Sequence, residues 1–124
     1  MPTERSSIVV QVFGVRKHAD VRKALRFFAE RRVETHFVDC DVRGPSAGEL
    51  KRFAARFGIA ALIDRRSRRF LERGLGPARY GDATWLEMLV EEPALLVLPL
   101  VRCGDDVTLG LNEKTWQQWV ADAR

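Results

Sequence analysis

The sequence IVVQVFGVRKHADVRKALRFF, residues 8–28, decides the fold. Its first six residues form an apolar, β-branched run that predicts a buried strand over 8–13. Gly14 and a short basic loop follow, and apolar residues then recur at helical spacing, which predicts a helix over 19–31. His18 stands at the mouth of that helix. A loop with cations at a helix N-terminus is a common place for anion chemistry in α/β proteins.

A second apolar stretch, residues 33–39, predicts another strand, so strand, helix and strand form a βαβ unit with parallel strands. Ser46 and Glu49 make a capping-box pattern at the start of a helix that ends at Gly58. The remaining predictions are a helical region over 59–75 interrupted by arginines, a loop over 74–81, a helix over 83–91 capped by Asp82, strands over 96–101 and 106–110 joined by a turn over 102–105, and a helix over 112–123. The order predicts an α/β protein: βαβ, then helices, then ββα.

Composition bounds the class of protein. The 124 residues predict a single domain over 1–124, and 46% hydrophobic content is typical of a globular chain. No apolar run approaches the roughly 20 residues of a membrane span, so we expect no membrane association. The polar residues 1–7 hold no signal-peptide core, and a cytoplasmic location is expected. The net charge is +4, and the densest cationic run, Arg65–Arg69, is interpreted as a solvated helix face, which makes nucleic acid an unlikely partner.

Several short motifs occur in a specific order and resemble one family. They are Val12-Phe13-Gly14 followed by His18-x-x-x-Arg22-Lys23-Ala24, then Ala61-Leu62-Ile63-Asp64-Arg65-Arg66-Ser67, Glu92-Pro93-x-Leu95-Leu96, Leu98-Pro99-Leu100-Val101-Arg102 and Val107-Thr108-Leu109-Gly110. Together they resemble the arsenate reductase (ArsC) and Spx family over about residues 8–120. The resemblance implies a thioredoxin-like fold: a four-stranded mixed sheet flanked by helices, with a helical insertion at about 46–92. It also implies that the peptide bond before Pro99 is cis.

The resemblance carries functional residues over one at a time. In the active reductases a loop cysteine attacks the arsenic oxyanion, with glutathione and glutaredoxin as reductants; that position is His18 here. Two arginines that hold the oxyanion correspond to Leu98 and Leu111, whereas Arg22 and Arg66 match basic positions. An imidazole cannot form the thiol–arsenate adduct or a mixed disulfide. We therefore expect an arsenate reductase-like protein without the reductase activity and without a cofactor; glutathione would serve only if activity survives.

The loop residues leave several interpretations open. The first interpretation of His18, which stands at the helix N-terminus beside Arg16 and Lys17, is a residue that only caps or decorates the loop. Contact with an anion or a partner is the second interpretation, and catalysis the third. Arg16, Lys17, Arg22 and Arg66 are candidates for a residual anion site, or else for a solvated basic rim.

The remaining histidine and the two cysteines give weaker signals. His36 is expected in the core or against the sheet, and it has no companions at metal-ligand spacing, so no metal site is predicted. Cys40, at the end of the second strand, is a conceivable relocated nucleophile but is expected to be a buried, passive thiol. Cys103 is expected to be exposed in the turn, where neighbouring carboxylates raise its pKa.

The sequence leaves the biochemical role to three hypotheses. The first is a binding or regulatory role through the loop and the helical insertion, with a protein partner or a small anion as the ligand. The second is a weak glutathione- or thiol-linked oxidoreductase that uses Cys40 or Cys103. The third is an RNA-polymerase-binding regulator similar to Spx.

Overall fold

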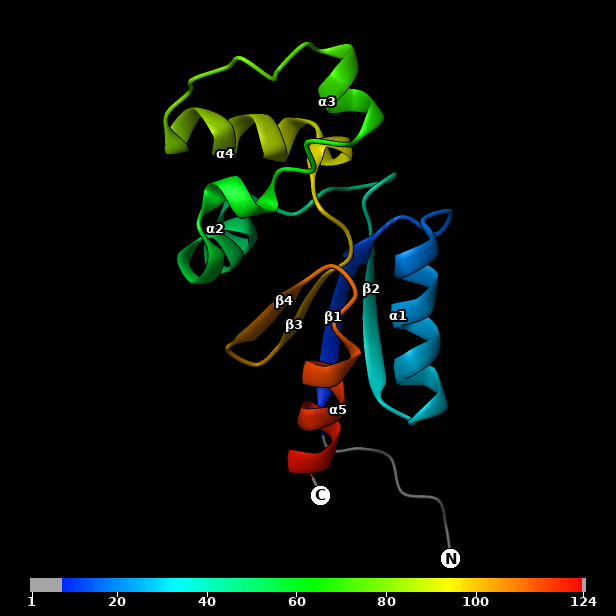
Figure 1. Ribbon diagram of the computed structural model, residues 1–124. Helices are drawn as coiled ribbons and strands as arrows, with labels where there is room; N and C mark the ends of the chain where they lie inside the picture. Colours follow the sequence, from blue (N-terminus) through cyan, green and yellow to red (C-terminus); the bar gives the residue numbers. More distant parts are fainter. Residues whose placement is uncertain (1–7, 124) are drawn as a thin grey trace, which may run out of the picture. The chain divides into compact units, whose positions relative to one another are not determined.

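The computed structural model describes residues 8–123 (Figure 1). These residues divide into two compact units. The first unit is made of the residues up to Asp39 together with those from Leu98 onward, and it contains the whole β-sheet. The second unit is Cys40–Val97, and it is helical.

The first unit is built on a mixed four-stranded sheet in the order β2-β1-β3-β4. The strands are β1 (Val9–Gly14), β2 (Glu34–Asp39), β3 (Leu100–Cys103) and β4 (Asp106–Leu109). β1 and β2 run parallel, while β3 is antiparallel to β1 and forms a hairpin with β4. The mixed four-stranded sheet, its parallel pair and its hairpin were predicted, whereas the strand order comes from the structure. Because a parallel pair needs a crossover, the connection between β1 and β2 carries α1 (Ala19–Glu30).

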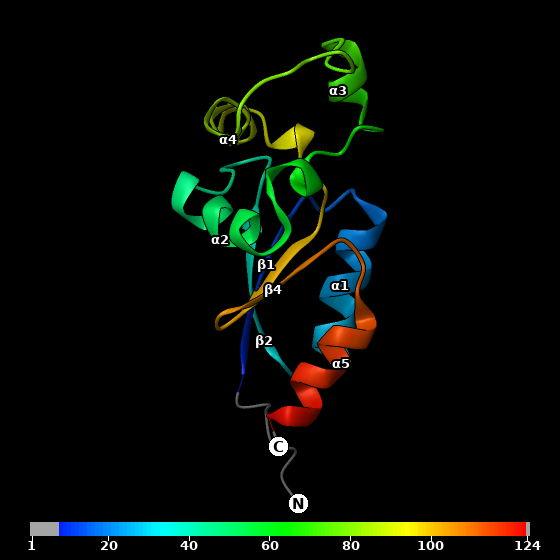
Figure 2. The ribbon, with the colours of Figure 1, turned by 60° about the vertical axis from the view of Figure 1, so that its left-hand side comes forward.

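The core of the first unit lies between the sheet and two helices. α1 and α5 (Glu113–Asp122) lie on the same side of the sheet (Figure 2). Buried side chains from β1, β3, α1 and α5 pack there, and Trp116 is fully buried among them. The indole N–H of Trp116 donates to the hydroxyl of Thr108 at 2.9 Å. This bond satisfies the polar end of the largest buried side chain, as a buried indole requires.

The second unit consists of short helical segments. They are α2 (Ala47–Phe57), the 3₁₀ segment η1 (Ile59–Leu62), α3 (Arg68–Glu72), α4 (Asp82–Glu91) and the 3₁₀ segment η2 (Pro93–Leu95). The predicted capping box at the start of α2 is confirmed: the Ser46 hydroxyl accepts the Glu49 backbone N–H, and the Glu49 carboxylate accepts the Ser46 N–H. Gly44 permits a close approach, because a Cβ there would lie 2.3 Å from Cγ of Pro93. None of the helices within residues 8–123 is long and apolar enough to cross a bilayer.

Two expected elements differ from the structure, and a third is confirmed as interrupted. α4 begins at Asp82 itself, and Gly81 takes the cap position without any side-chain bond, so Asp82 is not the cap. The expected interruption of the helical region over 59–75 is present, and it leaves two short segments, η1 and α3. The strand expected from residue 96 begins only at Leu100. Leu96 and Val97 instead pair with residues 62–64 within the second unit, and Pro99 has no N–H to donate to the sheet.

Candidate functional site

The loop between β1 and α1 is positioned by a close approach of strand and helix. A Cβ on Gly14 would lie 2.5 Å from Cγ2 and 2.8 Å from Cγ1 of the fully buried Val21. Only glycine therefore lets the end of β1 lie against the first turn of α1. The chain then turns over residues 15–18, and the backbone N–H of His18 donates to the carbonyl of Val15 at 3.1 Å. The loop 15–18 is thus held at both of its ends.

His18 is the N-cap of α1. Its backbone is extended, with φ −78° and ψ 127°, and its Nδ1 accepts the backbone N–H of Asp20 at 3.2 Å. That bond satisfies one of the donors that a helix leaves free in its first turn, a task usually performed by Ser, Thr, Asp or Asn. Because Nδ1 is an acceptor here, a neutral ring carries its proton on Nε2. The capping role considered from the sequence is therefore what the side chain performs.

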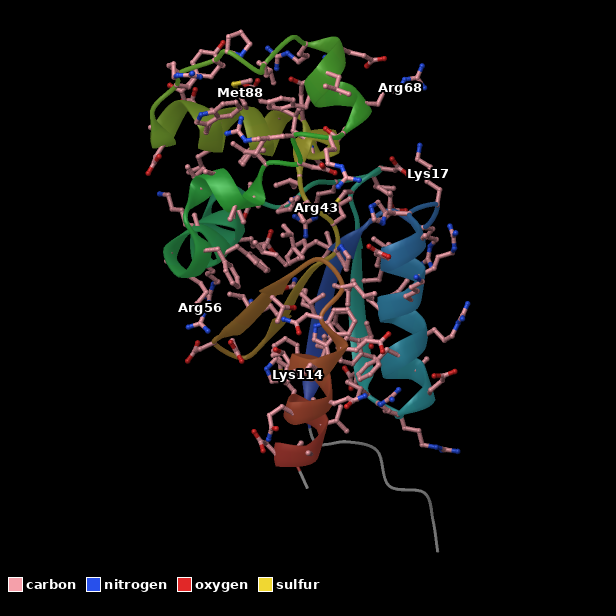
Figure 3. All side chains as sticks on the ribbon, viewed as in Figure 1. Lys17, Arg43, Arg56, Arg68, Met88 and Lys114 are labelled. Carbon is pink, nitrogen blue, oxygen red and sulfur yellow. The ribbon has the colours of Figure 1, made fainter. Side chains whose placement is uncertain are left out.

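The cations of the loop are largely engaged with the protein itself. Arg22 donates from Nη1 to the carbonyls of Lys17 at 2.6 Å and of Arg16 at 3.1 Å. The guanidinium of Arg16 lies over the ring of Phe37, 4.5 Å from its centroid, as in a cation–π contact. Lys17 is exposed and extends away from the ribbon (Figure 3), and its ammonium has no partner among the described residues. The three cations therefore lie together in the loop region, and Lys17 is the one whose charged group has no partner among the described residues.

Phe37 is the residue of this loop region that the sequence did not indicate. It lies on β2, and its Cα is the register partner of Val12 on β1. The sequence did contain a signal for Phe37: it lies in the second strand of a predicted parallel pair, near the C-terminal ends of the strands, where the loop begins. It supplies the surface on which the Arg16 side chain rests.

The segment around Pro99 reaches the same edge of the sheet. Leu100 pairs with Phe13, which places Pro99 beside the end of β1, and the carbonyl of Pro99 accepts the backbone N–H of Gly110 at 2.8 Å. The Leu98–Pro99 peptide bond is cis, as the resemblance implied. Leu98 is buried, whereas Leu111 is 42% exposed. The two positions expected to hold oxyanion-binding arginines in a reductase thus present apolar side chains.

Arg66 and Cys40 belong to the second unit. Arg66 is exposed and follows a turn in which its backbone N–H donates to a carboxylate oxygen of Asp64 at 3.0 Å. Its guanidinium has no hydrogen-bond or ion-pair partner among residues 8–123. Cys40 follows the last residue of β2 and is half-buried, so the expectation of a buried thiol is corrected.

Cys103 lies in a different environment from the one expected. It is the last residue of β3, paired with Asp106 across the hairpin, and it is half-buried rather than exposed in the turn, which consists of Gly104 and Asp105. Burial raises the pKa of the Cys103 thiol, and the negative charge of Asp106 raises it further. Both effects disfavour the thiolate, which is the nucleophilic form.

His36 is exposed, which corrects its expected place in the core. It lies on β2 between Thr35 and Phe37, and Phe37 packs against the core, so alternation along the strand directs His36 to the opposite face. Its Nε2 lies 2.9 Å from a carboxylate oxygen of Glu34. Across the part of the chain that the structure describes, no group of three or more His, Cys, Asp or Glu side chains could hold a metal ion.

Comparison with known proteins gives a consistent family signal. The model of the ArsC family matches residues 13–119 of this chain. An uncharacterized protein of Haemophilus influenzae is 28% identical over 111 residues, which cover 88% of this chain and 96% of that protein.

Solved structures show the same fold. An arsenate reductase from Vibrio cholerae superposes with a TM-score of 0.73 at 19% identity, covering 94% of this chain and 98% of its own. An arsenate reductase (ArsC) related protein from Brucella melitensis superposes with a TM-score of 0.68 at 17% identity, with coverage of 94% and 98%. At these identities the structures establish the thioredoxin-like fold, which is the fold that the sequence predicted.

Proposed function

Since the chain belongs to the ArsC family, whose model matches residues 13–119, we propose that it is an arsenate reductase-like protein that does not reduce arsenate and acts instead by binding a protein partner. The loop 15–18 is the proposed contact surface, and the role is regulatory rather than catalytic. The observation that carries the proposal is the hydrogen bond from the Asp20 backbone N–H to Nδ1 of His18. It makes the residue at the nucleophile position a structural cap.

The surrounding charges support the same conclusion. A doubly charged oxyanion needs several charge-assisted hydrogen bonds. Arg22, which could supply some of them, uses Nη1 for two backbone carbonyls of the loop, and Leu98 and Leu111 supply no charge. Fewer charged donors therefore face an oxyanion here than a reductase would need, and Lys17 is the exposed cation of the loop.

A thiol-linked oxidoreductase activity is the rival function. The raised pKa of Cys103 opposes it, because less thiolate is present at neutral pH. Arsenate reduction with glutathione and glutaredoxin, measured beside an active reductase, separates the two functions. We expect a rate equal to that of the reductants alone. A higher rate that disappears in Cys40→Ser or Cys103→Ser would refute the proposal.

The binding role is tested by affinity capture from the native lysate with paired variants. Lys17→Glu reverses the free charge of the loop, and Lys114→Glu reverses an exposed charge on α5 (Figure 3). We expect a protein captured by the wild type to be lost with Lys17→Glu and kept with Lys114→Glu. Equal capture by both variants would exclude the loop as the contact surface. Recovery of RNA polymerase would identify the role as Spx-like.

A small anion is the alternative ligand of the loop. A titration with inorganic phosphate, followed through the backbone amide signals of residues 15–20 and the side-chain Nε of Arg22, tests it directly. If the signals do not shift at tens of millimolar phosphate, anion binding by the loop is excluded, and the protein partner stays as the proposed ligand.

A further inference from the structure

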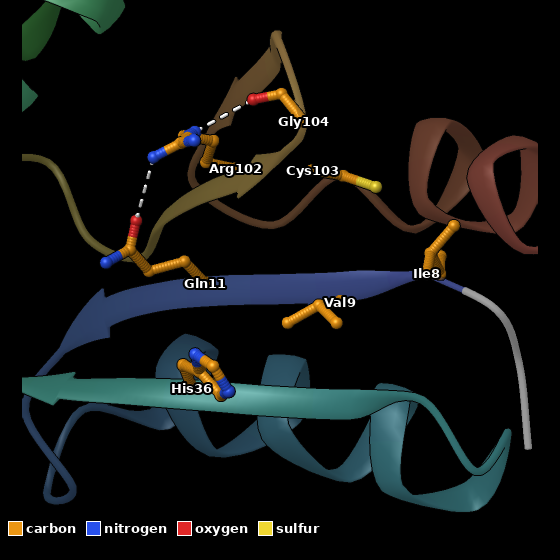
Figure 4. A pocket seen from close by; sticks show the side chains of 7 residues that line it. All are labelled: Ile8, Val9, Gln11, His36, Arg102, Cys103 and Gly104. Atoms are coloured by element: carbon orange, nitrogen blue, oxygen red, sulfur yellow. Dashed lines mark hydrogen bonds between the residues drawn. The ribbon is translucent and has the colours of Figure 1, made fainter.

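A row of polar side chains crosses the face of the sheet that α1 and α5 leave uncovered. The register places Gln11 of β1 opposite His36 of β2 on one side and opposite Arg102 of β3 on the other (Figure 4). Val10 and Val12 point into the core under the two helices. Because side chains alternate along a strand, Gln11 points the other way. None of the three side chains in the row takes part in the loop described above.

The hydrogen bonds within the row leave donors facing outward. Arg102 donates from Nε to the carbonyl of Gly104 at 2.8 Å and from Nη1 to Oε1 of Gln11 at 3.4 Å. The amide oxygen of Gln11 is therefore used, and its NH₂ group, like Nη2 of Arg102, has no partner among residues 8–123. The nearby carboxylate of Glu34 is held by His36. A guanidinium with two fixed bonds is held in place before any ligand arrives, so it suits a ligand that brings acceptor oxygens and a negative charge.

These groups line a shallow depression of about 550 Å³. Its lining is Ile8, Val9, Gln11, His36, Arg102, Cys103 and Gly104, and it includes no carboxylate. Val9 is 45% exposed, which leaves apolar surface beside the guanidinium. A depression of this volume, with an apolar wall beside a few convergent polar groups, has room for a small organic ligand.

We propose that this depression binds a small organic anion: a carboxylate held by Arg102 and the Gln11 amide, with a short aliphatic chain against Val9. The ligand's oxygens would meet the free N–H groups of both side chains, and its chain would cover the valine. The site lies on the face of the sheet opposite α1 and α5 and uses none of the loop residues, so it does not depend on the proposed function.

Isovalerate is a suitable probe, with isovaleramide as its uncharged analogue and inorganic phosphate as an anion without an apolar part. NMR titrations would follow the Arg102 Nε, the Gln11 side-chain amide and the Val9 methyl groups. We expect saturable shifts at all three with isovalerate at millimolar concentration, and affinities at least tenfold weaker with the other two compounds. Equal affinity for isovaleramide or for phosphate would overturn the proposal, as would unmoved signals.

Gln11→Glu is the decisive variant, because the new carboxylate still accepts from Arg102 but replaces the free donors with a negative charge. Gln117→Glu, at an exposed position on α5, makes the same charge change away from the site. We expect at least a tenfold loss of isovalerate affinity in the first and none in the second. Arg102→Gln should lose binding in the same way, and it provides a second folded variant if needed. Retained affinity in Gln11→Glu or Arg102→Gln, or an equal loss in Gln117→Glu, would refute the site.

Discussion

The contact between Gly14 and Val21 makes a prediction whose size follows from the structure. In Gly14→Ala the new methyl group would lie 2.5 and 2.8 Å from the two methyl groups of Val21, which is fully buried. Overpacking of this kind costs about 1–3 kcal/mol of unfolding free energy. Val21→Ala alone removes two buried methyl groups and costs roughly 2–3 kcal/mol.

The two substitutions should be strongly coupled. In the double variant the offending methyl groups are gone, and the nearest remaining atom, Cβ of residue 21, lies 3.2 Å from the new methyl. The methyl group introduced at position 14 then fills part of the space that the valine side chain vacated. We expect the double variant to be no less stable than Val21→Ala, which corresponds to a coupling of about 2 kcal/mol between the sites.

Urea unfolding measured by tryptophan fluorescence and by circular dichroism gives the free energies. Gly48→Ala is the matched control, because a Cβ there meets nothing closer than Ser46 Oγ at 3.9 Å and the position lies within α2. We expect it to stabilise the protein by about 0.5–1 kcal/mol. Additive losses from Gly14→Ala and Val21→Ala, or a Gly14→Ala variant as stable as the wild type, would show that the approach of β1 to α1 does not require glycine.

Three further predictions concern single groups. His18→Ala should lower the free energy of unfolding, measured with urea, by about 1 kcal/mol because the helix cap is lost. His18→Asn, which keeps a capping side chain, should lower it by only about 0.2–0.4 kcal/mol. Burial alone would raise the pKa of Glu92, but the hydrogen bonds and charges of Arg69 and Arg73 hold it below its usual 4.5. The ionised Glu92 therefore stabilises the protein above about pH 4.5, and this contribution is lost as the pH falls through the pKa of the folded state. In Glu92→Gln the free energy of unfolding should fall less steeply with decreasing pH in this range. The same pH dependence in Glu92→Gln and the wild type would contradict the role of Glu92. In a Cys40→Ser background, iodoacetamide should modify Cys103 more slowly at pH 8 than it modifies an unstructured peptide thiol, because the raised pKa leaves less thiolate; an equal rate would contradict the burial.

The order of elements could be predicted from the sequence because local signals agreed with one another. The β-branched run in β1, the helical spacing in α1 and the capping box at Ser46 each indicate one structure, and each is confirmed. The start of β3 could not be predicted in the same way. Residues 96–101 are continuously apolar, and the pattern does not reveal that Leu96 pairs with Ile63 before Leu100 pairs with Phe13. Partner choice is a tertiary property that apolar periodicity does not encode.

The candidate site shows the same limit at the level of side chains. A sequence places Arg22 one turn into a helix that follows a basic loop, and this position suggests anion binding. It cannot show that the guanidinium bends back to two carbonyls of its own loop. Arg16 is similar, since its contact with Phe37 depends on the register of the strand that follows α1. A cation's position was predictable, but its partner was not.

The interactions that shape the loop contain no sulfur. The close approach at Gly14, the cap at His18 and the two bonds from Arg22 hold residues 15–18 in place through packing, an imidazole nitrogen and a guanidinium. Loop geometry and thiol chemistry are therefore separable in this fold. His18→Cys should consequently keep the fold at a loss of about 1 kcal/mol, the value of a cap, and present a thiol at the helix N-terminus. It should still fail to reduce arsenate, because Leu98 and Leu111 supply no charged donors at two of the positions expected to hold the oxyanion. Turnover by His18→Cys alone would show that the cysteine was the only missing part.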